Sequence, residues 1–283
     1  MKTHKKLWKE VFHDSKEYIE YYFANKAVRS GVYSDYDDGH LCAMAYFTPY
    51  EAMFMGRECK THYIVGVATD KNYRHQKRMT KLLEQGIAVC FQEESPLVFL
   101  SPETPRVYKT LGFVGTYWRE TTTVNYTGER WYKTVPFNEL NKKRKDELAE
   151  FAEAMLLSEG FELYLKHSAG YYEEIEKELN ALNGGVLVLY EGQEIVAAAN
   201  YICEEGQMEV TELICQKDKG KKVVETISDH LGTAFLKIDD SYFISEIEGK
   251  GIVREKQEKP YIMYKITSTE ESPELRCYIN DIT

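Results

Sequence analysis

Four basic side chains gather just before a helical pattern. They are Arg74, His75, Lys77 and Arg78, and they follow an apolar run that ends at Thr69. A helix N-terminus presents unpaired backbone N–H groups and the positive end of the helix dipole, so it attracts anions. The pattern predicts an anion site that suits a pyrophosphate. A solvated basic first turn is the alternative that these residues leave open.

The elements around this segment are expected to be strand, loop, helix and strand. The run Thr61–Thr69 is β-branched and apolar, which is typical of a strand buried on both faces. Residues 78–91 place apolar side chains at helical spacing, and Pro96 ends that helix. Leu97–Leu100 is a second buried strand, and a loop and short helix follow up to Gly112. This order is that of a βαβ-like unit.

Further elements precede and follow this unit. Residues 5–27 predict two short amphipathic helices. Alternating or apolar runs bounded by turn residues predict strands. These runs are Val32–Tyr36, Leu41–Thr48, Glu51–Met55 and Thr116–Tyr126.

The second half of the chain repeats this order without repeating the side chains. Two helices, 141–157 and 171–182, precede three strands, a polar loop and a helix. The strands are Val186–Tyr190, Ile195–Ile202 and Met208–Cys215, the loop is Gln216–Lys222, and the helix is Val223–Leu231. The order of elements suggests an internal duplication. The loop contains four lysines, which favours a solvated surface turn.

The run VGVATDKNYRHQKRMTKLLEQG resembles motif A of the GNAT superfamily of N-acetyltransferases. It is most similar to the enhanced-intracellular-survival branch, which reads roughly V-x-T-x-P-x-Y-R-R-x-G-x-M-x-x-L-L. The matching positions are Val67, Thr69, Tyr73, Arg74, Met79, Leu82 and Leu83. Thr48–Glu51, Leu100–Pro102 and Tyr108–Phe113 match further segments of that branch. The resemblance covers residues 5–125 and, more weakly, the rest, where residues 260–266 resemble the family's closing strand.

The resemblance implies an α+β fold of two tandem GNAT-like lobes. Each lobe would be a mixed, mostly antiparallel twisted sheet flanked by helices. The expected division is 1–127 for a cofactor-binding lobe, 128–270 for a second lobe without an evident cofactor site, and 271–283 for a tail.

The resemblance also implies acetyl-CoA as co-substrate and assigns residues to it. The pantetheine would pair with backbone groups of Val67, Ala68 and Thr69, as an added strand does. The pyrophosphate site would be formed by Arg74, His75, Gln76, Lys77, Arg78, Met79 and Thr80. An amine would attack the thioester directly, and Tyr108 would protonate the leaving thiolate. Core packing is the alternative role for Tyr108.

Three positions depart from the family pattern. Lys77 replaces the glycine that lets backbone approach phosphate closely. His75 replaces the second arginine, and Lys71 replaces the proline. Lys77 either points away and adds charge, or blocks the site and leaves a non-catalytic relative.

The general base is the residue that the sequence identifies least well. Longer relatives add a sterol-carrier-like domain whose terminal carboxylate serves as base. This sequence ends at Thr283, too soon after the last strand for such a domain. Thr283 itself is therefore the candidate, with water or an acidic residue as alternatives.

The composition of the chain limits the classes of partner that we expect it to bind. The 283 residues carry a net charge of −10, which argues against nucleic-acid binding and is compatible with a cationic amine acceptor. The acceptor stays open among aminoglycosides, polyamines, lysines and peptide N-termini. Six cysteines without metal-ligand spacing predict no metal site. No signal peptide and no membrane span are evident, so we expect a cytoplasmic, bacterial-type protein. The alternative function is a catalytically silent GNAT-fold protein that binds a CoA ligand or a partner.

Overall fold

The computed structural model describes residues 3–125, 129–204, 206–249, 251–268 and 272–280. Its first half has four α-helices and five strands, in the order that the sequence predicts. They are α1 (His4–Phe12), α2 (Lys16–Asn25), β1 (Gly31–Asp37), β2 (His40–Phe54), β3 (Arg57–Thr69), α3 (Arg78–Gln92), β4 (Leu97–Leu100), α4 (Pro105–Lys109) and β5 (Val114–Tyr117). Side chains of Thr3 and Ser15 accept hydrogen bonds from the first turns of α1 and α2, which explains where these helices begin.

The second half confirms the predicted helices and strands and adds shorter ones. They are β6 (Glu120–Asn125), β7 (Lys133–Pro136), α5 (Lys142–Ser158), β8 (Leu163–Leu165), α6 (Ala169–Ala181), β9 (Gly185–Glu191), β10 (Glu194–Glu204), β11 (Gln207–Cys215), α7 (Gly220–Leu231), β12 (Phe235–Ile238), β13 (Ile252–Lys256), β14 (Ile262–Ile266) and β15 (Cys277–Tyr278). Five 3-10 turns accompany them, namely η1 (Ala27–Arg29), η2 (Lys71–Tyr73), η3 (Phe137–Glu139), η4 (Lys217–Lys219) and η5 (Tyr242–Ile244). The helix predicted from Val223 begins three residues earlier, at Gly220.

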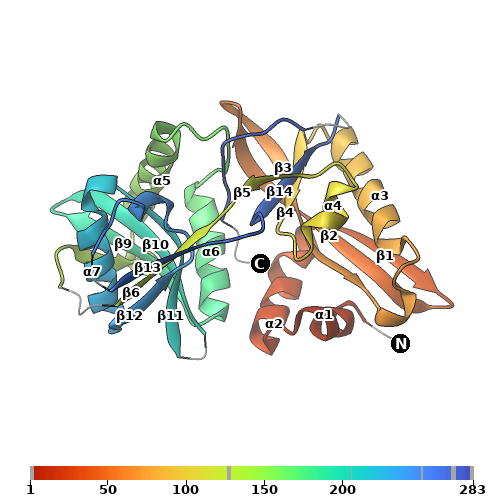
Figure 1. The fold of residues 1–283 in the computed structure, drawn as a ribbon, viewed down its shortest axis with the longest axis horizontal. Helices are drawn as coiled ribbons and strands as arrows, with labels where there is room; N and C mark the ends of the chain where they lie inside the picture. Colours follow the sequence, from red (N-terminus) through yellow and green to blue (C-terminus); the bar gives the residue numbers. More distant parts are fainter. Residues whose placement is uncertain (1–2, 126–128, 205, 250, 269–271, 281–283) are drawn as a thin grey trace.

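The strands form two sheets, one in each lobe (Figure 1). The first sheet runs β15-β8-β2-β3-β4-β14-β5, with β1 beside β2. The second runs β13-β6-β12-β11-β10-β9-β7. Most neighbours are antiparallel, while β3–β4, β11–β12 and β8–β15 are parallel. The fold is the mixed α+β pair of lobes that the sequence predicts.

The two lobes exchange strands. Strand β14, near the end of the chain, pairs with β4 and β5 in the first sheet. Strand β6, which directly follows β5 of the first sheet, pairs with β12 and β13 in the second. The expected single strand Thr116–Tyr126 is wrong, because the chain crosses between the sheets at Trp118 and Arg119. The domain boundary at residue 127 stays a prediction, since each sheet takes strands from both sides of it.

Two strands expected at Leu41–Thr48 and Glu51–Met55 are one continuous strand, β2. Proline in a strand lacks a ladder N–H, which is the reason for expecting a break at Pro49. Along one edge of β2, the pairing with β1 ends at Phe47, and the pairing with β8 begins at Ala52. Pro49 lies between these two partners on that edge, and on the other edge it stays in register with His62 of β3.

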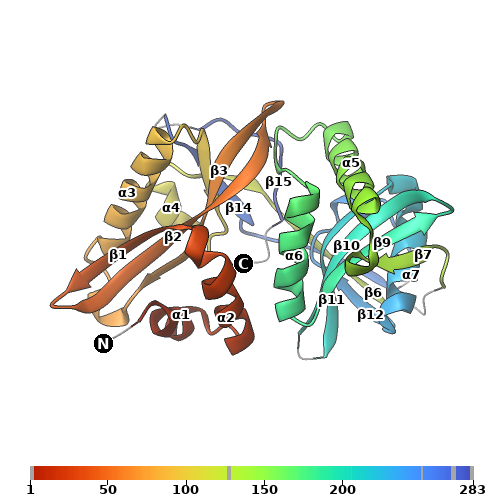
Figure 2. The same ribbon diagram turned by 180° about the vertical axis from the view of Figure 1, so that it is seen from behind.

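Three hydrophobic clusters form the core of the molecule, and the largest of them spans both lobes. One joins the face of the first sheet to α3, and Gly86 lets that helix approach the ring of Phe47 closely. A second lies under α1 and α2, around Trp8 and Tyr22. The largest continues from Tyr63 and Phe99 of the first sheet into the second lobe. In both views α2 and α6 face each other where the lobes meet (Figure 2).

All six cysteines are free thiols. Among the described residues, no helix has the length and apolar character needed to cross a membrane.

Candidate functional site

Strands β3 and β4, the central parallel pair of the first sheet, separate after a short ladder. Strands β3 and β4 are paired at His62 with Val98 and at Tyr63 with Phe99. Strand β4 ends at Leu100, whereas β3 continues to Thr69. The backbone edge of Val67–Thr69 therefore extends beyond the β4 ladder. This is the segment that the sequence assigns to the pantetheine.

A bulge lies in this part of β3. Tyr46 of β2 pairs with Val65 and Met44 pairs with Ala68, so Gly66 and Val67 together face one residue. Gly66 has φ +61, and a Cβ there would meet the ring of Trp8 at 2.3 Å. Only glycine fits this position, and sequence reasoning missed it. The signal was a lone glycine inside an otherwise β-branched strand.

The predicted pyrophosphate loop joins β3 to α3. His75 and Lys77 both have left-handed backbone conformations, with φ +64 and +58. Lys77 is the N-cap of α3, and its side chain makes no capping hydrogen bond. The position of the family's glycine is thus a left-handed one, which explains why that family has glycine there. The side chains of Arg74, His75, Gln76 and Lys77 are exposed around an uncapped helix start.

Arg78 is already bound to carboxylates of the β1–β2 hairpin. Its guanidinium is 2.8 Å from Asp35 and 3.4 Å from Asp37. The hydrogen bond that Arg78 donates to Asp35 is the main reason why the pKa of Arg78 is raised. A hollow of about 300 Å³ beside the loop is lined by Asp35, Gln76, Arg78 and Lys81, among others. The basic charge that sequence reasoning gave to this loop is therefore partly neutralised.

The hairpin contacts the loop at a second point. His40 stacks on Tyr73 with ring centroids 5.3 Å apart, and its Nε2 lies 3.1 Å from a carboxylate oxygen of Asp70. Asp70 in turn accepts a hydrogen bond from the backbone N–H of Asn72. The loop is therefore positioned by β1 and β2 as well as by β3 and α3.

Tyr108 lies on α4, against the cluster between the first sheet and α3. Its ring packs edge-on to Phe113 with centroids 6.0 Å apart. Burial raises the pKa of Tyr108 to about 12, so its hydroxyl keeps its proton at neutral pH. The other predicted catalytic residue, Thr283, lies outside the described residues.

The equivalent place in the second lobe is closed. The η4 turn runs straight into α7, without a loop like 74–77. Gly220 starts α7 and is buried, and an added Cβ there would lie 3.2 Å from Ile244 and 3.3 Å from Ile247. The η5 turn packs against β11 and fills the space beside it. Of the described helices, α7 is the one that corresponds to α3, and its first residue is covered in this way rather than open to an anion.

Comparison with protein families identifies the first of these lobes. Residues 1–115 match the family model described as "Acetyltransferase (GNAT) domain". The first lobe of the chain is therefore similar to a GNAT domain. The motif residues of β3 and α3, together with Tyr108, all lie inside the matched range.

Solved structures show how far this fold extends. A conserved protein from Enterococcus faecalis V583, described as a "Probable N-Acyltransferase", matches with a TM-score of 0.72 at 17% identity and covers 93% of this chain and 69% of its own. A GCN5-related N-acetyltransferase from Anabaena variabilis ATCC 29413 matches with a TM-score of 0.71 at 12% identity over the same shares. Eis1 from Mycobacterium abscessus matches with a TM-score of 0.57 at 9% identity, over 83% of this chain and 64% of its own.

These TM-scores establish a shared fold over both lobes of the chain. Sequence identities this low do not establish a shared substrate. No curated protein matches the sequence. The comparisons therefore show similarity to a GNAT domain in the first lobe and a shared two-lobed fold over the chain.

Proposed function

We propose that this protein is an acetyl-CoA-dependent N-acetyltransferase that acylates a primary amine of a small molecule or peptide. The observation that carries the proposal is the open edge of β3 beside an uncapped, basic start of α3. Val67, Ala68 and Thr69 offer backbone groups to an extended ligand arm. The N–H groups at the start of α3 offer an anion site next to it.

In this mechanism the chain's own residues bind and orient the cofactor and move protons. The amine nitrogen attacks the thioester carbonyl, the N–C bond forms and the C–S bond breaks. The departing thiolate takes its proton from the Tyr108 hydroxyl. The raised pKa of Tyr108 keeps this proton available over the whole neutral range. A cytoplasmic location remains a prediction from the sequence.

Binding and turnover test the two parts of this proposal separately. Acetyl-CoA at 100 times its Kd is expected to stabilise the protein by about 2.7 kcal/mol, visible as a higher melting temperature. Tyr108→Phe is expected to lower kcat by about 10²-fold with an unchanged Kd for acetyl-CoA. No thermal shift at saturating acetyl-CoA refutes the function, and an unchanged kcat in Tyr108→Phe refutes the role of this residue.

A second candidate function is favoured by the loop itself. Two side-chain-bearing residues, His75 and Lys77, adopt left-handed conformations there, and Arg78 is engaged by Asp35. These features suit a silent GNAT relative that binds a CoA ligand weakly or binds a partner. Acetyl-CoA binding without transfer to any primary amine would support this candidate.

A further inference from the structure

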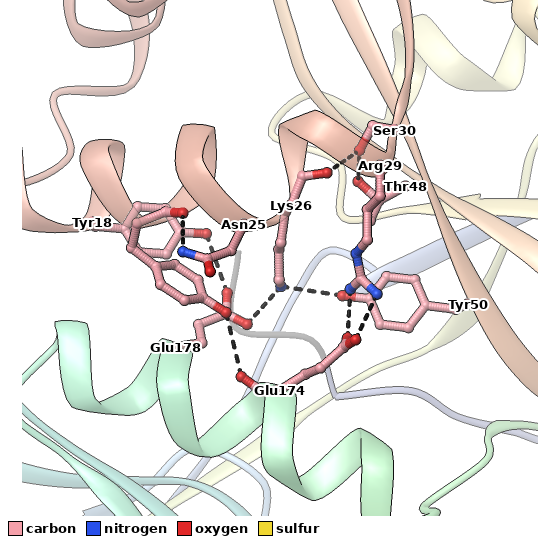
Figure 3. A network of polar contacts seen from close by, with 10 residues as sticks. Tyr18, Asn25, Lys26, Arg29, Ser30, Thr48, Tyr50, Glu174 and Glu178 are labelled. Atoms are coloured by element: carbon pink, nitrogen blue, oxygen red, sulfur yellow. Dashed lines mark hydrogen bonds and ion pairs between the residues drawn. The ribbon is translucent and has the colours of Figure 1, made fainter.

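A buried lysine joins the two lobes at the centre of the molecule (Figure 3). Lys26 follows α2, and its side chain is 4% exposed. Its ammonium lies 2.5 Å from the carboxylate of Glu178 on α6, which is 0% exposed. The same ammonium donates a hydrogen bond of 3.1 Å to the hydroxyl oxygen of Tyr50 on β2.

Stability alone explains this pair poorly. Removing two charges from water costs several kcal/mol per ion, and apolar side chains of similar size hold such a position as well or better. An exposed pair, Arg29 with Glu174, already joins the same two regions through two hydrogen bonds. A buried charge that the lobe contact does not require is a candidate for function.

Tyr50 lies next to the point where β3 and β4 part. It packs against Phe99 and Tyr63 with ring centroids 6.1 and 6.5 Å away, and these are the last paired residues of the two strands. Tyr50 is half-buried, so part of its side chain is open to solvent or to a substrate. The Tyr50 ring therefore lies against the end of the β3–β4 ladder, beyond which β3 continues toward Val67–Thr69.

Tyr50 and Tyr108 belong to opposite faces of the first sheet. Tyr108 packs against the cluster under α3, which contains Ile64 and Val98. Tyr50 packs against the cluster that continues into the second lobe, which contains Tyr63 and Phe99. An acyl group in the gap between β3 and β4 would therefore have one tyrosine on each side.

We propose that Tyr50 is the proton acceptor for the attacking amine, with Lys26 and Glu178 as its positioning residues. This inference rests on the proposed acetyl transfer. In the step, the amine nitrogen bonds to the carbonyl carbon and loses a proton to the Tyr50 phenolate oxygen. The C–S bond breaks and the thiolate takes a proton from Tyr108. Tyr50 then loses its extra proton to solvent, and Tyr108 regains one from solvent. The acceptor would approach from the side of α2 and α6.

The roles of the two positioning residues follow from their charges. The Glu178 carboxylate compensates the charge of the buried Lys26 ammonium and fixes its position. The ammonium in turn places an N–H on the Tyr50 oxygen, which stabilises the phenolate form. Because Glu178 comes from α6, the second lobe takes part in the chemistry of the first.

Tyr50→Phe is the direct test, because it removes the hydroxyl and keeps the ring. Thiol release from acetyl-CoA is measured with a polyamine, an aminoglycoside and a lysine-containing peptide, using the best of these as acceptor. Tyr50→Phe is expected to lower kcat by about 10²-fold or more. The rising limb of the pH profile of kcat/KM is expected to lose the contribution of Tyr50 and to keep only that of the acceptor amine, while the Kd for acetyl-CoA stays unchanged.

Tyr21→Phe is the matched control. Tyr21 also bridges α2 to α6, through a hydrogen bond of 3.3 Å to the backbone carbonyl of Glu174. The control loses a hydrogen bond of the same lobe contact and is expected to keep the wild-type pH profile. Equal effects of the two substitutions would mean that Tyr50 acts only on structure, and would overturn the proposal.

The double variant Lys26→Met with Glu178→Leu tests the positioning residues without leaving a buried charge unpaired. It is expected to fold, and its rising pH limb is expected to move to higher pH. A pH profile unchanged from wild type would overturn their role. A protein that does not bind acetyl-CoA would refute the proposed function itself. A protein that binds it and transfers normally in Tyr50→Phe would refute this inference alone.

Discussion

In the first lobe, β3 leaves its neighbour after Tyr63, and the chain takes an exposed loop before α3 begins. In the second, the corresponding strand β11 leaves β12 after Val210, and η4 leads directly into α7. The start of α3 is open, whereas the start of α7 is buried under Ile244 and Ile247. One arrangement of strands and helices thus yields an open site in one lobe and a packed core in the other.

The side chains at equivalent positions of β3 and β11 also differ between the two lobes. Two residues past the last parallel pair, the first lobe has Val65 and the second has Glu212. Glu212 is buried, with Oε1 3.1 Å from Nε2 of His167 and Oε2 accepting from Asn200 at 2.8 Å. The second lobe therefore has a polar network at the position where the first lobe has an apolar side chain packed against its hydrophobic clusters. Four predictions test this contrast, from the largest expected effect to the smallest.

Gly66→Ala is expected to cost about 2–5 kcal/mol of folding free energy and to abolish acetyl-CoA binding. The left-handed backbone costs about 1–2 kcal/mol for a residue with a Cβ, and the overlap with Trp8 adds an overpacking cost. Gly192→Ala in the second lobe is the control. It has φ +62 and open space around it, so it should lose only the backbone share. Equal losses by chemical denaturation would contradict the close fit of Trp8.

The His167–Glu212 contact predicts a pH-dependent stability of the second lobe. Burial disfavours the imidazolium, but the Glu212 carboxylate outweighs it, and the pKa of His167 is raised above 6.5. This contribution is complete below pH 6.5 and is lost as pH rises through the pKa of the folded state. Wild type should therefore lose stability relative to His167→Gln over that range. Parallel curves of unfolding free energy against pH would contradict this account.

Lys77→Gly is expected to raise stability by about 1 kcal/mol while weakening acetyl-CoA binding. Glycine relieves the left-handed strain, and the site loses a cation. Glu94→Gly relieves the same kind of strain, at φ +59 beyond the end of α3, and should leave binding unchanged. Tighter binding in Lys77→Gly would instead favour the silent relative, in which the lysine blocks the site.

Asp35→Asn is expected to tighten acetyl-CoA binding several-fold at low salt. The change frees Arg78 for a phosphate and removes a negative charge beside a polyanion site. The gain should shrink at high salt, because screening weakens both effects. Asp229→Asn removes the same charge beside Arg130 in the second lobe and should not change the Kd. Equal affinities of the two variants by calorimetry would contradict this role for Asp35.

Local elements of this structure were predictable, because periodicity and turn residues act over short distances. The helix at residues 78–92 and the buried strand before it follow directly from the spacing of their apolar side chains. The partners of the strands were not predictable. The run Ile262–Ile266 has the residue pattern of a strand, but this pattern does not indicate that the strand pairs between β4 and β5.

The site shows the same division. Tyr108 and the loop residues could be proposed from the sequence because their motif is contiguous, and their roles stay predictions. The cluster of Lys26, Tyr50 and Glu178 was missed, since its members come from three distant elements. Asp35 was missed for the same reason, and its neutralising effect on Arg78 corrects the charge expected from the loop alone.

The stoichiometry of acetyl-CoA binding tests the contrast between the lobes most directly. Isothermal titration of the full chain should give one molecule of acetyl-CoA per chain, and Gly66→Ala in the first lobe should abolish it. Two molecules per chain, or one that persists in Gly66→Ala, would show that the second lobe binds the cofactor and would contradict the account.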